Sequence, residues 1–152
     1  MKQRIPRRAW YSQSAPFRRR RVLVEDDRAA LAFSDFSQFQ QAGFDVAFCT
    51  GPGGDPRACP LMRGRECKVL ANADVVLHGL DSRLGIAAAI RRRYPGLPVV
   101  VQQRHPGDPG PQTVPDGCLL LPFGCSVRGQ TDALWRALVT PRRWTRHVST
   151  SG

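Results

Sequence analysis

Val22-Leu23-Val24-Glu25-Asp26-Asp27 is the stretch that decides the fold of this 152-residue chain. Three aliphatic residues are followed at once by three carboxylates, which is typical of a buried strand that ends at a polar edge. A matching run, Ala73-Asp74-Val75-Val76-Leu77-His78-Gly79, ends in His-Gly. Further short apolar runs occur at 44–48, 97–101 and 118–121. The sequence therefore predicts five buried strands.

Helical patterns separate these strands. Apolar residues recur at three- and four-residue steps from Arg28 to Gly43, over Leu84–Tyr94 and from about Gln130 to Val139, and a helical turn is expected over 68–72. Strands that alternate with helices predict a parallel sheet covered on both faces, with right-handed crossovers. We therefore expect a doubly wound α/β domain with strand order 2-1-3-4-5, whose ligand crevice lies at the carboxyl ends of the strands.

Two segments rich in Pro and Gly interrupt the pattern. Residues 50–65 are expected to form a loop, and residues 104–117 hold four prolines and three glycines. The second segment lies where the fourth helix of such a fold belongs. We predict that a loop replaces that helix.

The charge of +11 comes from the two ends of the chain. The first 21 residues carry eight basic residues and no acidic one, whereas the 12 Asp and Glu residues all lie between Val22 and Pro141. We expect a disordered basic arm over 1–20, a folded domain over 21–140 and a basic flexible tail over 141–152. The arm, with Arg18, Arg19, Arg20 and Arg21, is either a solvated tail or a segment that follows a phosphate backbone. No stretch is apolar enough to span a membrane and no secretory signal is visible, so we expect a cytoplasmic protein.

Several motifs resemble those of bacterial response-regulator receiver domains. Glu25 and Asp26 are similar to the acidic pair that holds Mg²⁺ in that family. The family's second strand, its fourth strand and its Lys-Pro-Phe motif resemble Gly43-Phe44-Asp45-Val46, Leu97-Pro98-Val99-Val100-Val101 and Leu121-Pro122-Phe123. The resemblance covers roughly residues 21–138 and implies a CheY-like fold.

The departures from the family fall on its working residues. Gly79 stands at the phosphoacceptor position, Gln103 replaces the switch Ser or Thr, and Leu121 replaces the Lys that would contact the phosphoryl group. Phosphoryl transfer needs an oxygen nucleophile and a cationic clamp. We therefore expect a degenerate acidic pocket that is neither phosphorylated nor a Mg²⁺ site. His78 is read as a core histidine, and Asp81 as a remote substitute acceptor.

Three cysteines lie in or beside the first loop, at Cys49, Cys59 and Cys67. Soft thiolates suit zinc or an iron–sulfur cluster, but the spacing lacks a Cys-x-x-Cys pair and a fourth ligand. Free thiols, a metal site and a redox disulfide all remain open.

The leading hypothesis is a non-enzymatic regulatory pseudo-receiver that acts on a protein partner, with neither that partner nor the oligomeric state given by the sequence. The alternatives are a metal- or redox-responsive sensor that uses the cysteine loop 49–67, and a nucleic-acid-associated protein that uses the basic arm.

Overall fold

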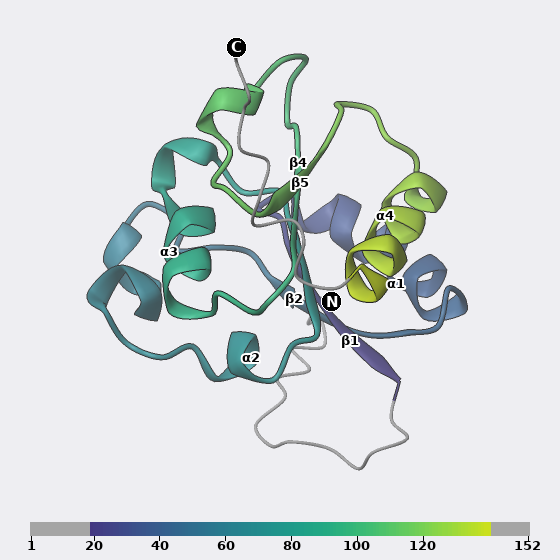
Figure 1. Ribbon diagram of the computed structural model, residues 1–152, viewed down its shortest axis with the longest axis horizontal. Helices are drawn as coiled ribbons and strands as arrows, with labels where there is room; N and C mark the ends of the chain where they lie inside the picture. Colours follow the sequence, from purple (N-terminus) through teal and green to yellow (C-terminus); the bar gives the residue numbers. More distant parts are fainter. Residues whose placement is uncertain (1–18, 141–152) are drawn as a thin grey trace, which may run out of the picture.

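A five-stranded parallel sheet forms the centre of the protein (Figure 1). The computed structural model describes residues 19–140, with the exception of the side chains of 29–34, so the expectations for residues 1–18 and for the tail 141–152 lie outside the described residues. The strands are β1 (Arg20–Glu25), β2 (Phe44–Cys49), β3 (Val75–His78), β4 (Val99–Gln102) and β5 (Cys118–Leu121). Their order is β2-β1-β3-β4-β5, and every neighbouring pair is parallel. The predicted fold class is confirmed.

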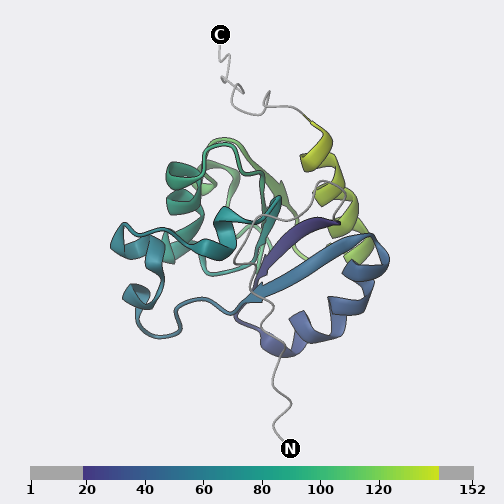
Figure 2. The ribbon, with the colours of Figure 1, turned by 90° about the horizontal axis from the view of Figure 1, so that it is seen from below.

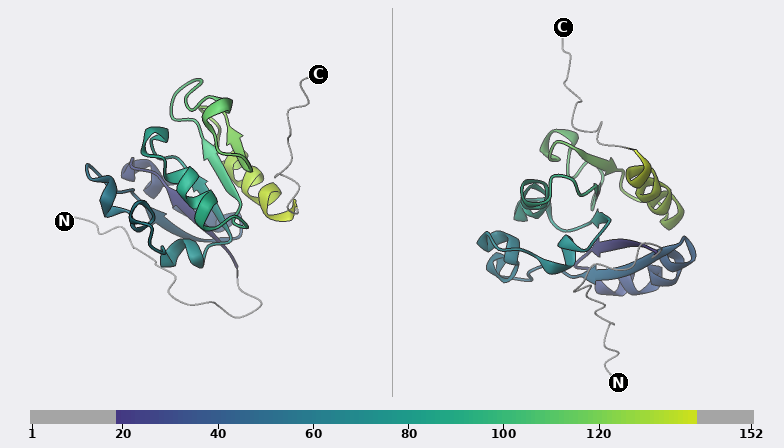
Figure 3. Two further views of the ribbon diagram at one scale, coloured as in Figure 1. Left: turned by 60° about the vertical axis from the view of Figure 1, so that its left-hand side comes forward. Right: turned by 60° about the horizontal axis from the view of Figure 1, so that its bottom comes forward.

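Helices cover both faces of the sheet, and the views in Figures 1, 2 and 3 agree on this arrangement. Helices α1 (Ala29–Gln41) and α4 (Val127–Val139) lie on one face, and α2 (Lys68–Ala71) and α3 (Ile86–Arg93) lie on the other. Helix α4 begins three residues earlier than the apolar pattern suggested. The cause is Ser126, whose hydroxyl accepts a hydrogen bond from the Gly129 amide at 3.1 Å and caps the first turn.

Two apolar layers hold the helices to the sheet. On the α4 face, strand residues such as Val22, Val24 and Val75 pack against Leu134 of α4. Phe44 of β2 stacks on Trp135, with ring centroids 4.6 Å apart, and the Trp135 indole donates a hydrogen bond to the Ala42 carbonyl at 3.0 Å. On the α3 face, the alternate strand residues pack with residues of α3 and of the loop after β2. This alternation explains why each strand reads as a continuous apolar run.

Both loops rich in Pro and Gly hold only short helical turns. Residues after β2 form the 3-10 turns Pro56–Ala58 and Pro60–Arg63, and the segment between β4 and β5 holds only the 3-10 turn Pro111–Thr113. A further 3-10 turn, Ser82–Leu84, precedes α3. The predicted replacement of the fourth helix by a loop is confirmed. In the part of the chain from 19 to 140, no helix combines the length and the apolar character needed to cross a membrane.

Candidate functional site: the carboxylate edge of the sheet

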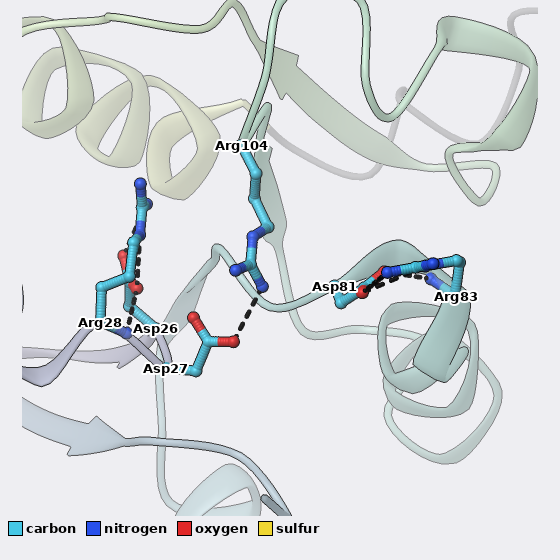
Figure 4. Close-up of polar contacts among 6 residues, drawn as sticks. All are labelled: Asp26, Asp27, Arg28, Asp81, Arg83 and Arg104. Atoms are coloured by element: carbon cyan, nitrogen blue, oxygen red, sulfur yellow. Dashed lines mark hydrogen bonds and ion pairs between the residues drawn. The ribbon is translucent and has the colours of Figure 1, made fainter. Parts of the chain in front are cut away.

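Four acidic side chains follow the carboxyl ends of the central strands. Glu25, Asp26 and Asp27 come at the end of β1 and Asp81 comes three residues after β3; we call this group the carboxylate edge. Ligands of doubly wound folds bind at this end of the sheet. Figure 4 shows that three of these carboxylates each face an arginine of the same chain.

Both oxygens of Asp26 are held by Arg28. Oδ1 accepts hydrogen bonds from the Arg28 backbone amide at 2.8 Å and from Nε at 3.0 Å, and Oδ2 accepts from the guanidinium at 3.0 Å. The hydrogen bond to Asp26, supported by its charge, raises the pKa of Arg28. Asp26 is largely buried, with a side-chain exposure of 13 %, so the ion pair is only partly screened by water. A guanidinium of the same chain thus occupies both oxygens of Asp26.

Gly79 lies directly against this ion pair. Its amide donates a hydrogen bond to the Glu25 carbonyl at 2.7 Å. A Cβ added at Gly79 would lie 3.1 Å from that carbonyl oxygen and 3.4 Å from Oδ2 of Asp26. The phosphoacceptor position of the resemblance is therefore next to Asp26, as the motif alignment requires. It carries no oxygen nucleophile, and the surroundings leave little room for a side chain.

Asp27 and Asp81 are also paired with arginines. Asp27 accepts from Arg104 at 3.0 Å, across 77 positions of sequence. Asp81 binds Arg83 through both of its oxygens, with a shortest distance of 2.7 Å. The hydrogen bonds from Arg83 lower the pKa of Asp81 to about 2. Figure 4 shows Asp81 turned toward Arg83 and apart from Asp26, so the structure gives no support to Asp81 as a substitute acceptor.

Glu25 is the one member of the carboxylate edge that pairs with a histidine and not with an arginine. Its side chain points to the α3 face, where Oε1 lies 2.9 Å from Nδ1 of His78. This pair is deeply buried, with exposures of 4 % for Glu25 and 2 % for His78. The other ring nitrogen of His78, Nε2, is buried and has no hydrogen-bond partner among the described residues. His78 is thus a core histidine oriented by a carboxylate, as its apolar flanks indicated.

The remaining pocket positions have structural roles. The Gln103 amide group bridges two loops, because Nε2 donates to the Pro109 carbonyl at 3.0 Å and Oε1 accepts from the Phe123 amide at 3.1 Å. Leu121 is buried in the apolar layer of the α4 face. Of the five expected pocket residues, only Asp26 and Gly79 lie directly beside each other at the carboxyl ends of the strands.

This donor set does not fit Mg²⁺. Mg²⁺ prefers an octahedral shell of oxygens from carboxylates and water. Here both oxygens of Asp26 accept hydrogen bonds from Arg28, and one oxygen of Glu25 is hydrogen-bonded to His78. Gly79 has no side-chain oxygen to offer a metal ion. Within residues 19–140, no three His, Cys, Asp or Glu side chains converge as metal ligands, and this includes the cysteine loop.

The cysteines proposed as zinc or iron–sulfur ligands are free thiols. Cys59 and Cys67 are half-buried against the apolar layer of the α3 face. Cys49 is exposed as a residue, but its sulfur accepts from the Gly51 amide at 3.4 Å. Desolvation of that sulfur, aided by the Glu25 charge, raises the pKa of Cys49 to about 11, and burial also raises the pKa of Cys67. Protonated thiols are poor nucleophiles, and no three metal-ligating side chains converge in the described part of the cysteine loop, so the sensor alternative gains no support.

Sequence reasoning missed the three arginines that neutralise the edge. The Asp26–Arg28 and Asp81–Arg83 pairs share an Asp-x-Arg spacing, and in both the carboxylate also accepts from the arginine backbone amide. That repeated spacing after a strand was the available signal. Arg104 gave none, because its partner Asp27 becomes a neighbour only when β1 and β4 take their places in the sheet.

The sequence matches no family model and no curated protein. Solved structures do resemble it. A response regulator receiver domain protein from Clostridium thermocellum superposes with a TM-score of 0.59 at 13 % identity, over 78 % of this chain and 94 % of that one. A response regulator receiver protein from Sinorhizobium medicae gives 0.58 at 17 % identity, over 79 % and 94 %. An orphan response regulator of H. pylori gives 0.54 at 17 % identity, over 78 % and 96 %.

These likenesses agree with the strand order and with the helices on both faces of the sheet. At such low identity they concern the fold. The chain has the fold of a response-regulator receiver domain.

Proposed function

We propose that this protein is a non-enzymatic signalling module that binds a protein partner in a single, phosphorylation-independent state. The observation that carries the proposal is the Asp26–Arg28 pair beside Gly79. Both carboxylate oxygens are occupied by the guanidinium, and the neighbouring position has no side chain. A receiver fold without acceptor or metal ligand keeps its surfaces but has no phosphoryl chemistry with which to change them.

The charge balance of the edge supports this reading. In a phosphorylated site, the added anion and the metal ion would draw the surrounding loops together. Here the loops after β1 and β4 are already joined by Asp27 and Arg104, and Gln103 fastens the loop that replaces the fourth helix. The conformation that binds the partner is therefore formed on folding and does not require phosphorylation.

Phosphodonor titration of the full chain tests the proposal. Amide spectra of the ¹⁵N-labelled protein are recorded with Mg²⁺ alone and then with acetyl phosphate, and the intact mass is measured in parallel. We expect neither a shift of the resonances around Asp26, Gly79 and Arg104 nor a phosphoryl adduct. A hydroxylamine-sensitive adduct on the wild-type chain would overturn the proposal.

A matched variant shows that the assay can detect a working site. Gly79→Asp combined with Arg28→Gln returns a carboxylate beside Asp26 and removes the guanidinium that competes for it. We expect this variant to be stabilised by Mg²⁺ in thermal unfolding, because two adjacent carboxylates repel each other until a cation binds between them. Gly79→Asp with Arg28 retained is the control and is expected to respond less.

A further inference from the structure

We infer that the surface built by the turn Pro60–Arg63, α2 and α3 binds the phosphate backbone of nucleic acid through Arg63, Arg65, Lys68, Arg92 and Arg93. We call these five residues the basic layer. All five are exposed. This surface lies on the α3 face of the sheet and is built from other residues than the basic arm considered in the sequence, and the inference does not depend on the signalling role proposed above.

Among the residues that the structure describes, the cations of the basic layer have no anionic partner. None of the five forms an ion pair with a carboxylate of residues 19–140, whereas Arg28, Arg83 and Arg104 at the carboxylate edge are all paired. Glu66 is the one acidic residue in 60–71, and 86–94 contains none. The neighbouring Arg91 is also engaged, since it donates to the carbonyls of Asp116, Pro95 and Leu97. The five remaining cations are therefore available to an external anion.

The fold brings these cations together from two separate segments. The Tyr94 hydroxyl accepts from the Cys67 amide at 3.0 Å and lies 3.2 Å from the Cys67 carbonyl, to which it donates. This contact joins the start of α2, which carries Lys68, to the end of α3, which carries Arg92 and Arg93. Beneath them, Leu61, Leu70 and Ile90 share one apolar layer. Figure 1 shows α2 and α3 on the same side of the sheet.

The turn before α2 is also fixed. The Arg65 amide donates to the Pro60 carbonyl at 2.9 Å, and Gly64 ends the turn in the left-handed conformation with φ of 68°. Arg63 and Arg65 therefore project from a defined turn that is seated on Leu61, which is 8 % exposed. The basic layer is a scaffolded surface rather than a flexible charged tail.

The chemistry of the layer favours a phosphate backbone over an acidic peptide. Four of the five cations are arginines, whose planar guanidinium forms paired hydrogen bonds with phosphate oxygens. Peptide interfaces usually depend on buried apolar or aromatic anchors. The two segments expose one large apolar side chain, Met62 at 37 %. A polyanion with a charge about every 1.7 Å needs no such anchor, and the basic residues of the arm would add to its attraction.

The test is salt-dependent binding of a labelled duplex DNA of mixed sequence to the full chain. One variant replaces all five residues of the basic layer by Gln. The matched control replaces Arg4, Arg7, Arg8, Arg18 and Arg19 by Gln and so removes the same charge from the arm. Each phosphate contact contributes about 0.9 to the slope of log affinity against log salt. We expect the layer variant to lower this slope by about 2 to 4 and to weaken binding at low salt.

Three results would overturn the inference. The first is an affinity and slope equal to wild type in the layer variant, with the loss confined to the arm variant. The second is unchanged DNA binding alongside lost binding to poly-glutamate, which would identify an acidic protein partner. The third is unchanged DNA binding alongside lost binding to vesicles of anionic lipid. Thermal unfolding verifies the folded state, and if the quintuple variant unfolds, the Arg63→Gln/Arg65→Gln and Arg92→Gln/Arg93→Gln pairs are each expected to lower the slope by about 1 to 2.

Discussion

The buried contact between Glu25 and His78 offers the most demanding test of how the sheet is held together. The two side chains are 4 % and 2 % exposed and share a 2.9 Å hydrogen bond. Replacing His78 by Leu leaves the Glu25 carboxylate buried without that partner, and breaking a buried pair in this way costs about 3 to 5 kcal/mol. Replacing Glu25 by Leu leaves both ring nitrogens of His78 unpaired, at a cost of about 1 to 3 kcal/mol.

The double variant Glu25→Leu/His78→Leu removes both polar groups at once. Two apolar side chains of similar volume can replace a buried polar pair with little change in stability. We expect the double variant to be more stable than either single variant, with a coupling energy of at least about 2 kcal/mol in the double-mutant cycle.

Chemical denaturation with urea, followed by far-UV circular dichroism, measures the four free energies of unfolding. A single substitution that costs about 3 kcal/mol lowers Tm by roughly 10 °C in a domain of this size. If the cost of the double variant equals the sum of the two single costs, Glu25 and His78 do not interact as described and the reasoning is refuted. The slope with denaturant serves as the control, since an unchanged slope shows that the unfolded reference is the same.

Three further predictions follow from the edge and the loop. Arg104→Gln removes the contact to Asp27. Because this ion pair is partly exposed, we expect the free energy of unfolding to fall by at most about 1 kcal/mol. Amide hydrogen exchange in residues 103–110 is expected to become faster, and unchanged exchange would contradict the contact. Because the pKa of Cys49 is raised to about 11, its alkylation by iodoacetamide, followed by mass spectrometry, is expected to rise through pH 9 to 11, and a plateau by pH 9 would argue against it. The hydrogen bonds from Arg83 lower the pKa of Asp81 to about 2, so the contact stabilises the fold above the unfolded pKa of about 4. This stabilisation is lost as pH falls from about 4 to about 2. A carboxyl titration by NMR is expected to give a midpoint near pH 2 for Asp81 in the wild type, and Arg83→Gln is expected to return that midpoint toward about 4.

The sequence predicted the sheet because each strand lies between two apolar layers. Val22–Val24 and Val75–Leu77 alternate between the α3 and α4 faces, so every position is buried and the run is continuous. Boundaries were less certain, because hydrogen bonds rather than hydropathy set them. The polar Arg20 and Glu25 extend β1 through pairing with β2, and Ser126 moves the start of α4.

The site was predicted only in outline. The alignment of motifs placed Gly79 beside Asp26, since the chain order of the strands fixes which ends meet. It did not predict that Glu25 would turn to His78, because that contact depends on the register between β1 and β3, where Glu25 pairs with His78. Nor did composition indicate that the arginines of the edge are paired, whereas those of the basic layer form no ion pair with the described carboxylates.

The position of Trp135 in α4, the last of the described helices, has a consequence for synthesis. Its ring stacks on Phe44 and its indole binds the carbonyl of Ala42, more than ninety positions earlier in the sequence. Helix α1 and strand β2 therefore cannot pack against α4 until α4 has left the ribosome. Contacts between such distant positions are slow to form, so a nascent chain stalled before α4 is expected to expose Phe44 and to need protection from chaperones.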